Sequence, residues 1–83
     1  MTDFLRLFRA MADATRLRLL ALLEKEELSV HELQEITGLA QSRISTHLGL
    51  LQNAGLLQSR RAGRRVFYRL SPDAAGPARE LIA

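Results

Sequence analysis

The chain has 83 residues and a net charge of +3, with 47% hydrophobic and 25% charged residues, a balance typical of one small folded domain. It contains no cysteine, which excludes disulfides and thiolate metal sites. No apolar run approaches the roughly 18 residues that a membrane-spanning helix needs. Arg6, Arg9 and Asp13 also interrupt the N-terminal apolar segment, which argues against a signal peptide. We therefore expect a cytoplasmic protein without a membrane segment.

The basic residues are unevenly distributed. Residues 1–57 hold six basic and seven acidic residues, whereas residues 58–83 hold six basic and only two acidic residues. A local cluster of arginines indicates a polyanionic partner more strongly than a modest net charge does. The alternative is a basic surface that is simply solvated.

The first 25 residues predict two helices. Between residues 3 and 11 the large apolar residues are Phe4, Leu5, Leu7, Phe8 and Met11. The spacing of Phe4, Phe8 and Met11 makes one helical stripe, and this apolar helix must pack on the domain body or on a second copy. Asp13 is a suitable N-cap for the next helix, which ends in the acidic segment 24–27. The buried side of this second helix is expected to consist of Leu17, Leu20, Ala21 and Leu23.

Residues 29–55 predict two short helices around a tight turn. Ser29 and Glu32 form an S-x-x-E capping box at the start of the first, and Gly38 can end it in a left-handed conformation. Leu39 can fill the corner that follows. The inward side of this helix is expected to consist of Val30, Leu33 and Ile36.

The second of these helices runs from Gln41 to Gly55, and its buried face is expected to hold Ile44, Leu48 and Leu51. The opposite face is polar and carries small side chains, which are Ser42, Thr46, Gly49 and Asn53. Three residues flank this face at the N-terminal end of the helix: Gln41, Arg43 and Ser45. A recognition helix reads bases with its N-terminal residues, and Gln and Arg can make bidentate base contacts.

Residues 56–70 predict a β-hairpin with an arginine-rich tip. Two strands, 56–61 and 65–70, flank the turn, in which Gly63 suits a positive φ. Such a ribbon can straddle a phosphate backbone or enter a minor groove through its arginines, which are Arg60, Arg61, Arg64 and Arg65. The elements together predict a mostly α fold with a small β-hairpin (α+β), a winged helix-turn-helix over the single domain 1–83. A short C-terminal helix is expected over residues 77–83, with Pro77 in its first turn.

Five segments resemble one known family when they are taken together. They are Ala12-Asp13-Ala14-Thr15-Arg16; Glu27-Leu28-Ser29-Val30 leading to Leu33; Gln41-Ser42 with Ser45 and His47-Leu48; Ala54-Gly55-Leu56; and Phe67-Tyr68-Arg69-Leu70. Over residues 4–70 the chain resembles the arsenic-repressor-type (ArsR-like) winged-helix regulators. The resemblance implies a homodimeric repressor that binds a palindromic operator and releases it on a signal. It also implies that the first and last helices form the dimer and that the recognition residues are Gln41, Ser42, Arg43, Ser45, Thr46 and His47.

The sequence departs from this family where family members bind metals. Ser29 and His31 occupy the region in which arsenic and cadmium sensors carry cysteines, and no histidine follows His47. A position that commonly holds lysine is Gly49, and one that often holds a serine cap is Ala40. The resemblance therefore implies DNA binding without the family's metal sites, so we expect no metal or other cofactor and leave the inducer unassigned.

Neither catalysis nor a new metal site is indicated. The sequence has no nucleophilic triad in a supporting context, no phosphate-binding glycine loop and no paired carboxylates, which argues against an enzyme. His31 with Glu32 or Glu35, and His47 on another helix, do not complete a tetrahedral zinc site. His31 is expected to be exposed; His47 can contact a phosphate or pack beside the core.

The leading hypothesis is a sequence-specific DNA-binding repressor whose partners are double-stranded DNA and a second copy of the chain. The expected dimer interface consists of Phe4, Leu5, Phe8, Leu81 and Ile82. One alternative is the N-terminal dimerisation or interaction module of a larger protein, such as a methyltransferase fusion, because the chain stops within the last predicted helix. A small metal sensor with a histidine site is the third possibility.

Overall fold

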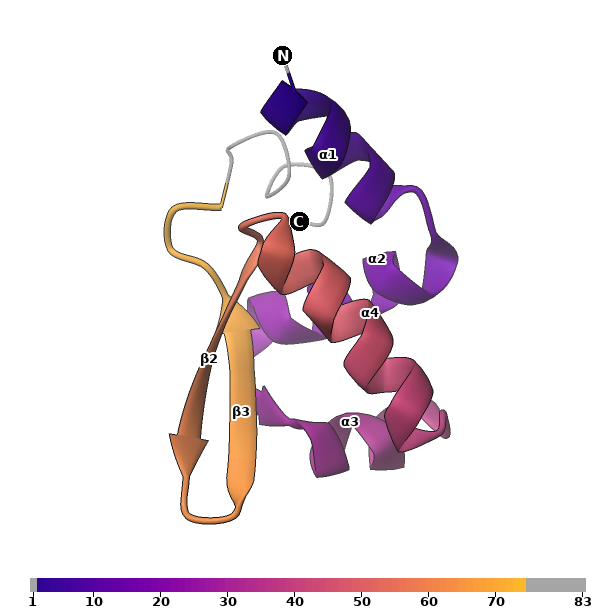
Figure 1. The fold of residues 1–83 in the computed structure, drawn as a ribbon. Helices are drawn as coiled ribbons and strands as arrows, with labels where there is room; N and C mark the ends of the chain where they lie inside the picture. The colour runs from indigo at the N-terminus through magenta and orange to yellow at the C-terminus, as the bar shows by residue number, and fades with distance from the viewer. Residues whose placement is uncertain (1, 75–83) are drawn as a thin grey trace.

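The computed structural model describes residues 2–74, with side chains placed from Leu5 onward. Within this range, four helices and a three-stranded antiparallel sheet make a winged helix-turn-helix, as the sequence predicts (Figure 1). The elements in chain order are α1 (Thr2–Met11), α2 (Ala14–Lys25), β1 (Leu28–Ser29), α3 (Val30–Thr37), α4 (Gln41–Asn53), β2 (Leu57–Ala62) and β3 (Arg65–Leu70).

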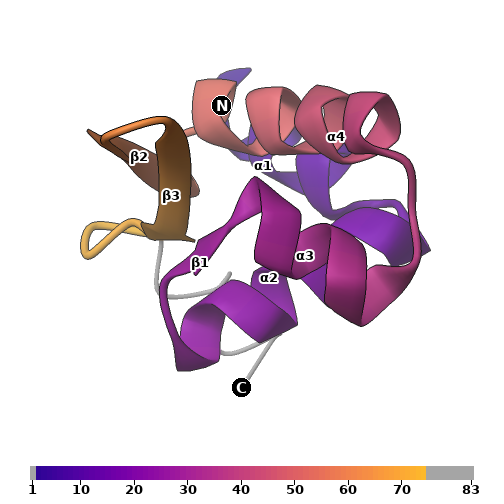
Figure 2. The ribbon, with the colours of Figure 1, turned by 90° about the horizontal axis from the view of Figure 1, so that it is seen from below.

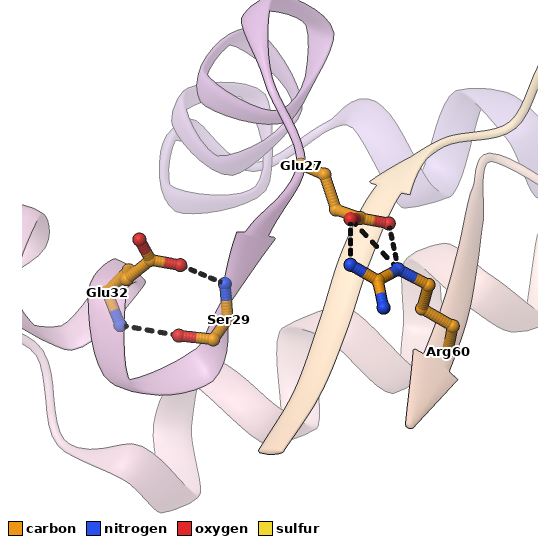
Figure 3. Close-up of polar contacts among 4 residues, drawn as sticks. All are labelled: Glu27, Ser29, Glu32 and Arg60. Carbon is orange, nitrogen blue, oxygen red and sulfur yellow. Dashed lines mark hydrogen bonds and ion pairs between the residues drawn. The ribbon is translucent and has the colours of Figure 1, made fainter. Parts of the chain in front are cut away.

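Local hydrogen bonds set the ends of the helices. Asp13 caps α2, because its Oδ1 accepts from the backbone N–H of Arg16 at 3.0 Å. The capping box at the start of α3 is complete: Ser29 Oγ accepts from the N–H of Glu32 at 3.1 Å, and Glu32 Oε1 accepts from the N–H of Ser29 at 2.8 Å (Figure 3). Gly38 ends α3 with a φ of +73°, a conformation that costs glycine little. These three expectations are confirmed.

The buried side chains form one cluster between the helices and the inner face of the sheet. The core positions expected in α4 are confirmed, since Ile44, Leu48 and Leu51 are fully buried, and Leu39 packs against the cluster from the α3–α4 corner. The other large members are Met11, Leu19, Leu20, Leu23, Leu28, Leu33, Leu56, Leu57 and Leu70. Each such side chain contributes roughly 1.5–3 kcal/mol by leaving water, so this cluster dominates the stability of the fold.

Two expected core positions are wrong. Leu17 is 39% exposed, and Leu19 takes the buried place, because Leu17 lies more than a quarter turn from the middle of the stripe around Leu19, Leu20 and Leu23. Ile36, in the last turn of α3, is 45% exposed instead of facing inward. The helical period determines which residues share a face. It does not determine which part of that face the neighbouring elements cover.

The sheet has the order β1-β3-β2, with β3 in the middle. The β2–β3 hairpin is the predicted wing, and Gly63 at its turn has a φ of +63°. The expected first strand starts one residue too early, since β2 begins at Leu57. The strand β1 was not expected: its two residues pair with β3 in the register Leu28↔Tyr68 and Ser29↔Phe67. It leads directly into α3, so the wing is joined to the helix-turn-helix by backbone pairing (Figure 2).

Several expectations fall outside the described residues. They concern the C-terminal helix over 77–83 with Leu81 and Ile82, and also the side chain of Phe4. In the part of the chain that the structure describes, no helix combines the length and apolar character needed to cross a membrane.

Candidate nucleic-acid interface

The first turns of α4 present an open polar surface. Gln41, Ser42, Arg43 and the following Ser45 and Thr46 are all exposed, while Ile44 between them is buried and holds the helix to the core. Thr46 Oγ1 donates back to the carbonyl of Ser42 at 2.9 Å, so this hydroxyl keeps only acceptor capacity for a ligand. No side chain caps the start of α4, where Ala40 is the N-cap, so the first backbone N–H groups of the helix remain available.

His47 belongs to a contact between helices rather than to the open surface. It is partly buried, and its Nδ1 lies 3.3 Å from Nη1 of Arg16 on α2. The same guanidinium donates from Nε to the carbonyl of Ala10 at 2.6 Å and from Nη2 to that of Arg9 at 3.1 Å. Arg16 thus joins α1, α2 and α4, and of the two roles considered for His47 the packing role describes its present surroundings.

The tip of the wing holds three arginines without an acidic partner. Arg61, Arg64 and Arg65 are exposed, and the only ion pairs among residues 5–74 are His31–Glu35 and Glu27–Arg60. Their side chains are therefore available to an external anion such as a phosphate.

Arg60 differs from its neighbours at the tip. Its Nη2 lies 2.7 Å from Oε1 of Glu27, and its Nε donates to Oε1 and Oε2 at 2.9 and 3.0 Å (Figure 3). Its guanidinium carbon lies 4.8 Å from the ring centre of Phe67. These hydrogen bonds lower the pKa of the Glu27 carboxyl and raise the pKa of Arg60 from their usual values. Sequence reasoning missed Glu27, which lies 33 residues from Arg60 and carries no local signal for the pairing.

A groove of about 260 Å³ connects the recognition helix with the wing. Gln41 borders it from α4, and Arg64 and Arg65 border it from the tip of the wing. Two residues of α3 that were not proposed as DNA contacts, His31 and Gln34, form part of its wall. A helical wheel places these two on the outer side of α3, but only the folded chain shows that this side faces the wing.

Among the side chains described from Leu5 to Ala74, no group of three or more His, Asp or Glu residues could hold a metal ion. His31 Nε2 instead pairs with Glu35 Oε1 at 2.8 Å on the surface of α3, and its side chain is 63% exposed, as expected for a first-turn residue.

Comparison with known proteins confirms the resemblance. Residues 13–59 match the family model described as bacterial regulatory protein, arsR family. The arsenic resistance transcriptional regulator ArsR1 of Pseudomonas putida is 46% identical over 67 residues, which are 80% of this chain and 52% of the relative. The arsenical resistance operon repressor of Escherichia coli is 43% identical over 79 residues, 94% of this chain and 68% of the relative.

The solved structure of HlyU from Vibrio cholerae N16961 has the same fold, with a TM-score of 0.86 at 37% identity over 98% of this chain and 85% of that one. The chain spans about half the length of the Pseudomonas relative. Both curated relatives carry the names of regulators and not of enzymes. From the family match and this shared fold, the chain belongs to the arsR family of bacterial regulatory proteins.

Proposed function

We propose that the chain is a sequence-specific DNA-binding regulator of transcription that acts as a cytoplasmic repressor. The observation that carries the proposal is the groove that Gln41 of α4 shares with Arg64 and Arg65 of the wing. This shared lining supports a surface on which α4 reads bases and the wing binds phosphate. The Escherichia coli relative is named an operon repressor, which supports repression as the outcome of binding.

In the proposed complex, the N-terminal half of α4 enters the major groove. Gln41 and Arg43 contact base edges, and Ser42, Ser45 and Thr46 allow a close approach of the helix. The open N–H groups at the start of α4 favour a backbone phosphate beside the groove. His47 acts by holding α4 on α2 through Arg16.

The wing tip binds the flanking phosphate backbone. Arg61, Arg64 and Arg65 supply positive charge and form no ion pair with another described side chain. Phosphate contacts fix the orientation of a protein on the duplex without reading its sequence. A homodimer then places two recognition helices about 34 Å apart, one turn of DNA, which matches a palindromic operator.

The proposal is tested by fluorescence anisotropy on the DNA upstream of the chain's own gene and on a shuffled duplex, at two salt concentrations. We expect a preference of about a thousandfold for the native duplex. Arg43→Ala should lose roughly 1–3 kcal/mol of discrimination at one base pair. Arg64→Ala with Arg65→Ala should weaken binding to both duplexes and reduce the salt slope by up to about two units.

The matched control is Lys25→Ala, which removes one exposed positive charge from the end of α2, outside the groove. It should leave the salt slope unchanged. Equal binding of native and shuffled duplexes would overturn sequence-specific regulation and favour an interaction module. Reporter transcription that rises when the chain is expressed would overturn repression while leaving DNA binding intact.

A further inference from the structure

The ion pair between Glu27 and Arg60 spans the whole sheet. Glu27 directly precedes the edge strand β1, and Arg60 lies on the opposite edge strand β2, with β3 between them. Phe67 of β3 is the register partner of both Ser29 and Arg60. The side chains of Arg60 and Phe67 therefore stand on the same face, with the guanidinium carbon over the Phe67 ring. From there the guanidinium reaches Glu27 across the sheet (Figure 3).

This ion pair connects the wing to the segment before α3 through side chains, in addition to the short backbone pairing of β1 with β3. Sheet pairing joins the wing to the strand before α3 through the two residues of β1. A two-stranded ribbon by itself is marginally stable and twists easily. The ion pair adds a second connection at the middle of β2, between the base of the wing and its tip.

The same geometry separates Arg60 from the three tip arginines. Nε and Nη2 of Arg60 are both engaged by the Glu27 carboxylate, and the plane of the guanidinium lies near the Phe67 ring. A phosphate contact by Arg60 would require this bidentate pair to open. The sequence alone counts Arg60 with Arg61, Arg64 and Arg65, but the fold gives it a different environment.

We infer that Arg60 is a positioning residue: with Glu27 and Phe67 it forms a latch that holds the wing at a fixed angle to α4, and it does not contact DNA. The inference rests on the proposed DNA-binding function. A wing held in the bound orientation loses less conformational freedom when it meets the phosphate backbone, so the latch raises DNA affinity without adding a phosphate contact.

The test compares Glu27→Gln, Arg60→Gln and the double variant in DNA anisotropy at several salt concentrations. If Arg60 is a latch, each single variant weakens binding about two- to fivefold, a range set by the known strength of exposed ion pairs. The double variant then binds DNA no more weakly than the single variant that binds less tightly. The salt slope of binding stays at the wild-type value. The direction of the change in DNA affinity for Glu27→Gln is decisive. If Glu27 did not hold the wing, removing its negative charge near DNA would strengthen binding.

A phosphate contact by Arg60 gives the opposite pattern. Arg60→Gln then lowers the salt slope by about 0.9 units, and Glu27→Gln leaves binding unchanged or strengthens it. Either result overturns the latch. Arg69→Gln is the matched control: it removes the same charge from the same face of the sheet, but Arg69 Nη2 donates to Gln58 and not to Glu27. Its effect should be smaller than that of Arg60→Gln.

Amide hydrogen exchange of the DNA-free chain separates this inference from the proposed function. The latch predicts faster exchange in β2 and β3 in both single variants, and recovery towards the wild-type rate in the swapped variant Glu27→Arg with Arg60→Glu. Unchanged exchange in the single variants overturns the latch even if the chain binds DNA. If the variants show these exchange changes but the chain binds no DNA, the proposed function is overturned. The conclusion that the ion pair orders the wing would still hold.

Discussion

At the scale of single residues, two arginines make long-range contacts that local sequence does not indicate. Arg16 connects two carbonyls at the end of α1 with His47 on the recognition helix. Arg60 holds Glu27 across the sheet. The partners of each arginine lie outside its own helix or strand. Composition and charge clustering therefore reveal where the arginines are in the sequence, but not which groups they bind.

Arg16→Lys is expected to lower the free energy of unfolding by roughly 1–2 kcal/mol, because an ammonium group cannot reproduce a fork that bonds three acceptors at once. Urea denaturation measures the change. Arg18→Lys is the control, since Arg18 makes a single 3.4 Å contact to the carbonyl of Ile36 on the surface, and it should change stability by less. Equal losses in the two variants would show that Arg16 does not join the helices.

At the scale of elements, the described helices and the hairpin turn follow local chemistry. The caps at Asp13 and Ser29 and the positive φ of Gly38 and Gly63 are formed by residues within a few positions of one another. Because these residues lie close together in the chain, local sequence is enough to predict these caps and turns. The strand β1 was missed because two residues carry no period, and only their pairing with β3 defines them.

The capping box also gives the fold a pH dependence. Hydrogen bonds from the backbone and the hydroxyl of Ser29 lower the pKa of Glu32, so its carboxylate is favoured in the folded chain. This contribution is fully present above the unfolded pKa of about 4 and is lost as pH falls through the lower folded pKa. Asp13 and Glu27 have lowered pKa values and act in the same direction.

Stability should therefore be flat above about pH 5 and decline in more acidic solution. Glu32→Gln, which keeps an amide oxygen for the N–H of Ser29, should decline less steeply with falling pH than the wild type. Urea midpoints between pH 2 and 7 provide the comparison. Identical pH profiles would contradict a role for the Glu32 carboxylate in the cap.

At the scale of the whole molecule, α1 presents apolar side chains on two sides. Met11 and Ala10 are buried in the core, whereas Leu5 and Phe8 are 54% and 51% exposed. Leu5 also borders a groove of about 460 Å³ between α1 and α4, together with the exposed Leu50. One side of α1 therefore packs on the domain body, and an isologous dimer would cover the exposed apolar side.

Phe8→Ser is expected to weaken self-association at least about tenfold, because apolar aromatic side chains dominate interface energies. Sedimentation equilibrium at micromolar concentration measures it. Ile36→Ser removes a comparably exposed apolar side chain from α3, far along the chain from α1, and should leave the association constant unchanged. A wild-type chain that is monomeric under these conditions would exclude the proposed dimer.

The sequence by itself determined the helix caps, the turn at Gly63, the buried face of α4 and the arginine-rich tip, because each depends on residues that are neighbours in the chain or share one helix face. Only the tertiary structure decided the pairing of β1 with β3 and the groove between α4 and the wing. It also decided the two long-range contacts, Arg16–His47 and Glu27–Arg60, whose partners lie 31 and 33 residues apart. Such contacts depend on how the elements pack around the core. Arg60 and Arg64 look alike in the sequence, yet the fold gives only one of them an acidic partner among the described residues.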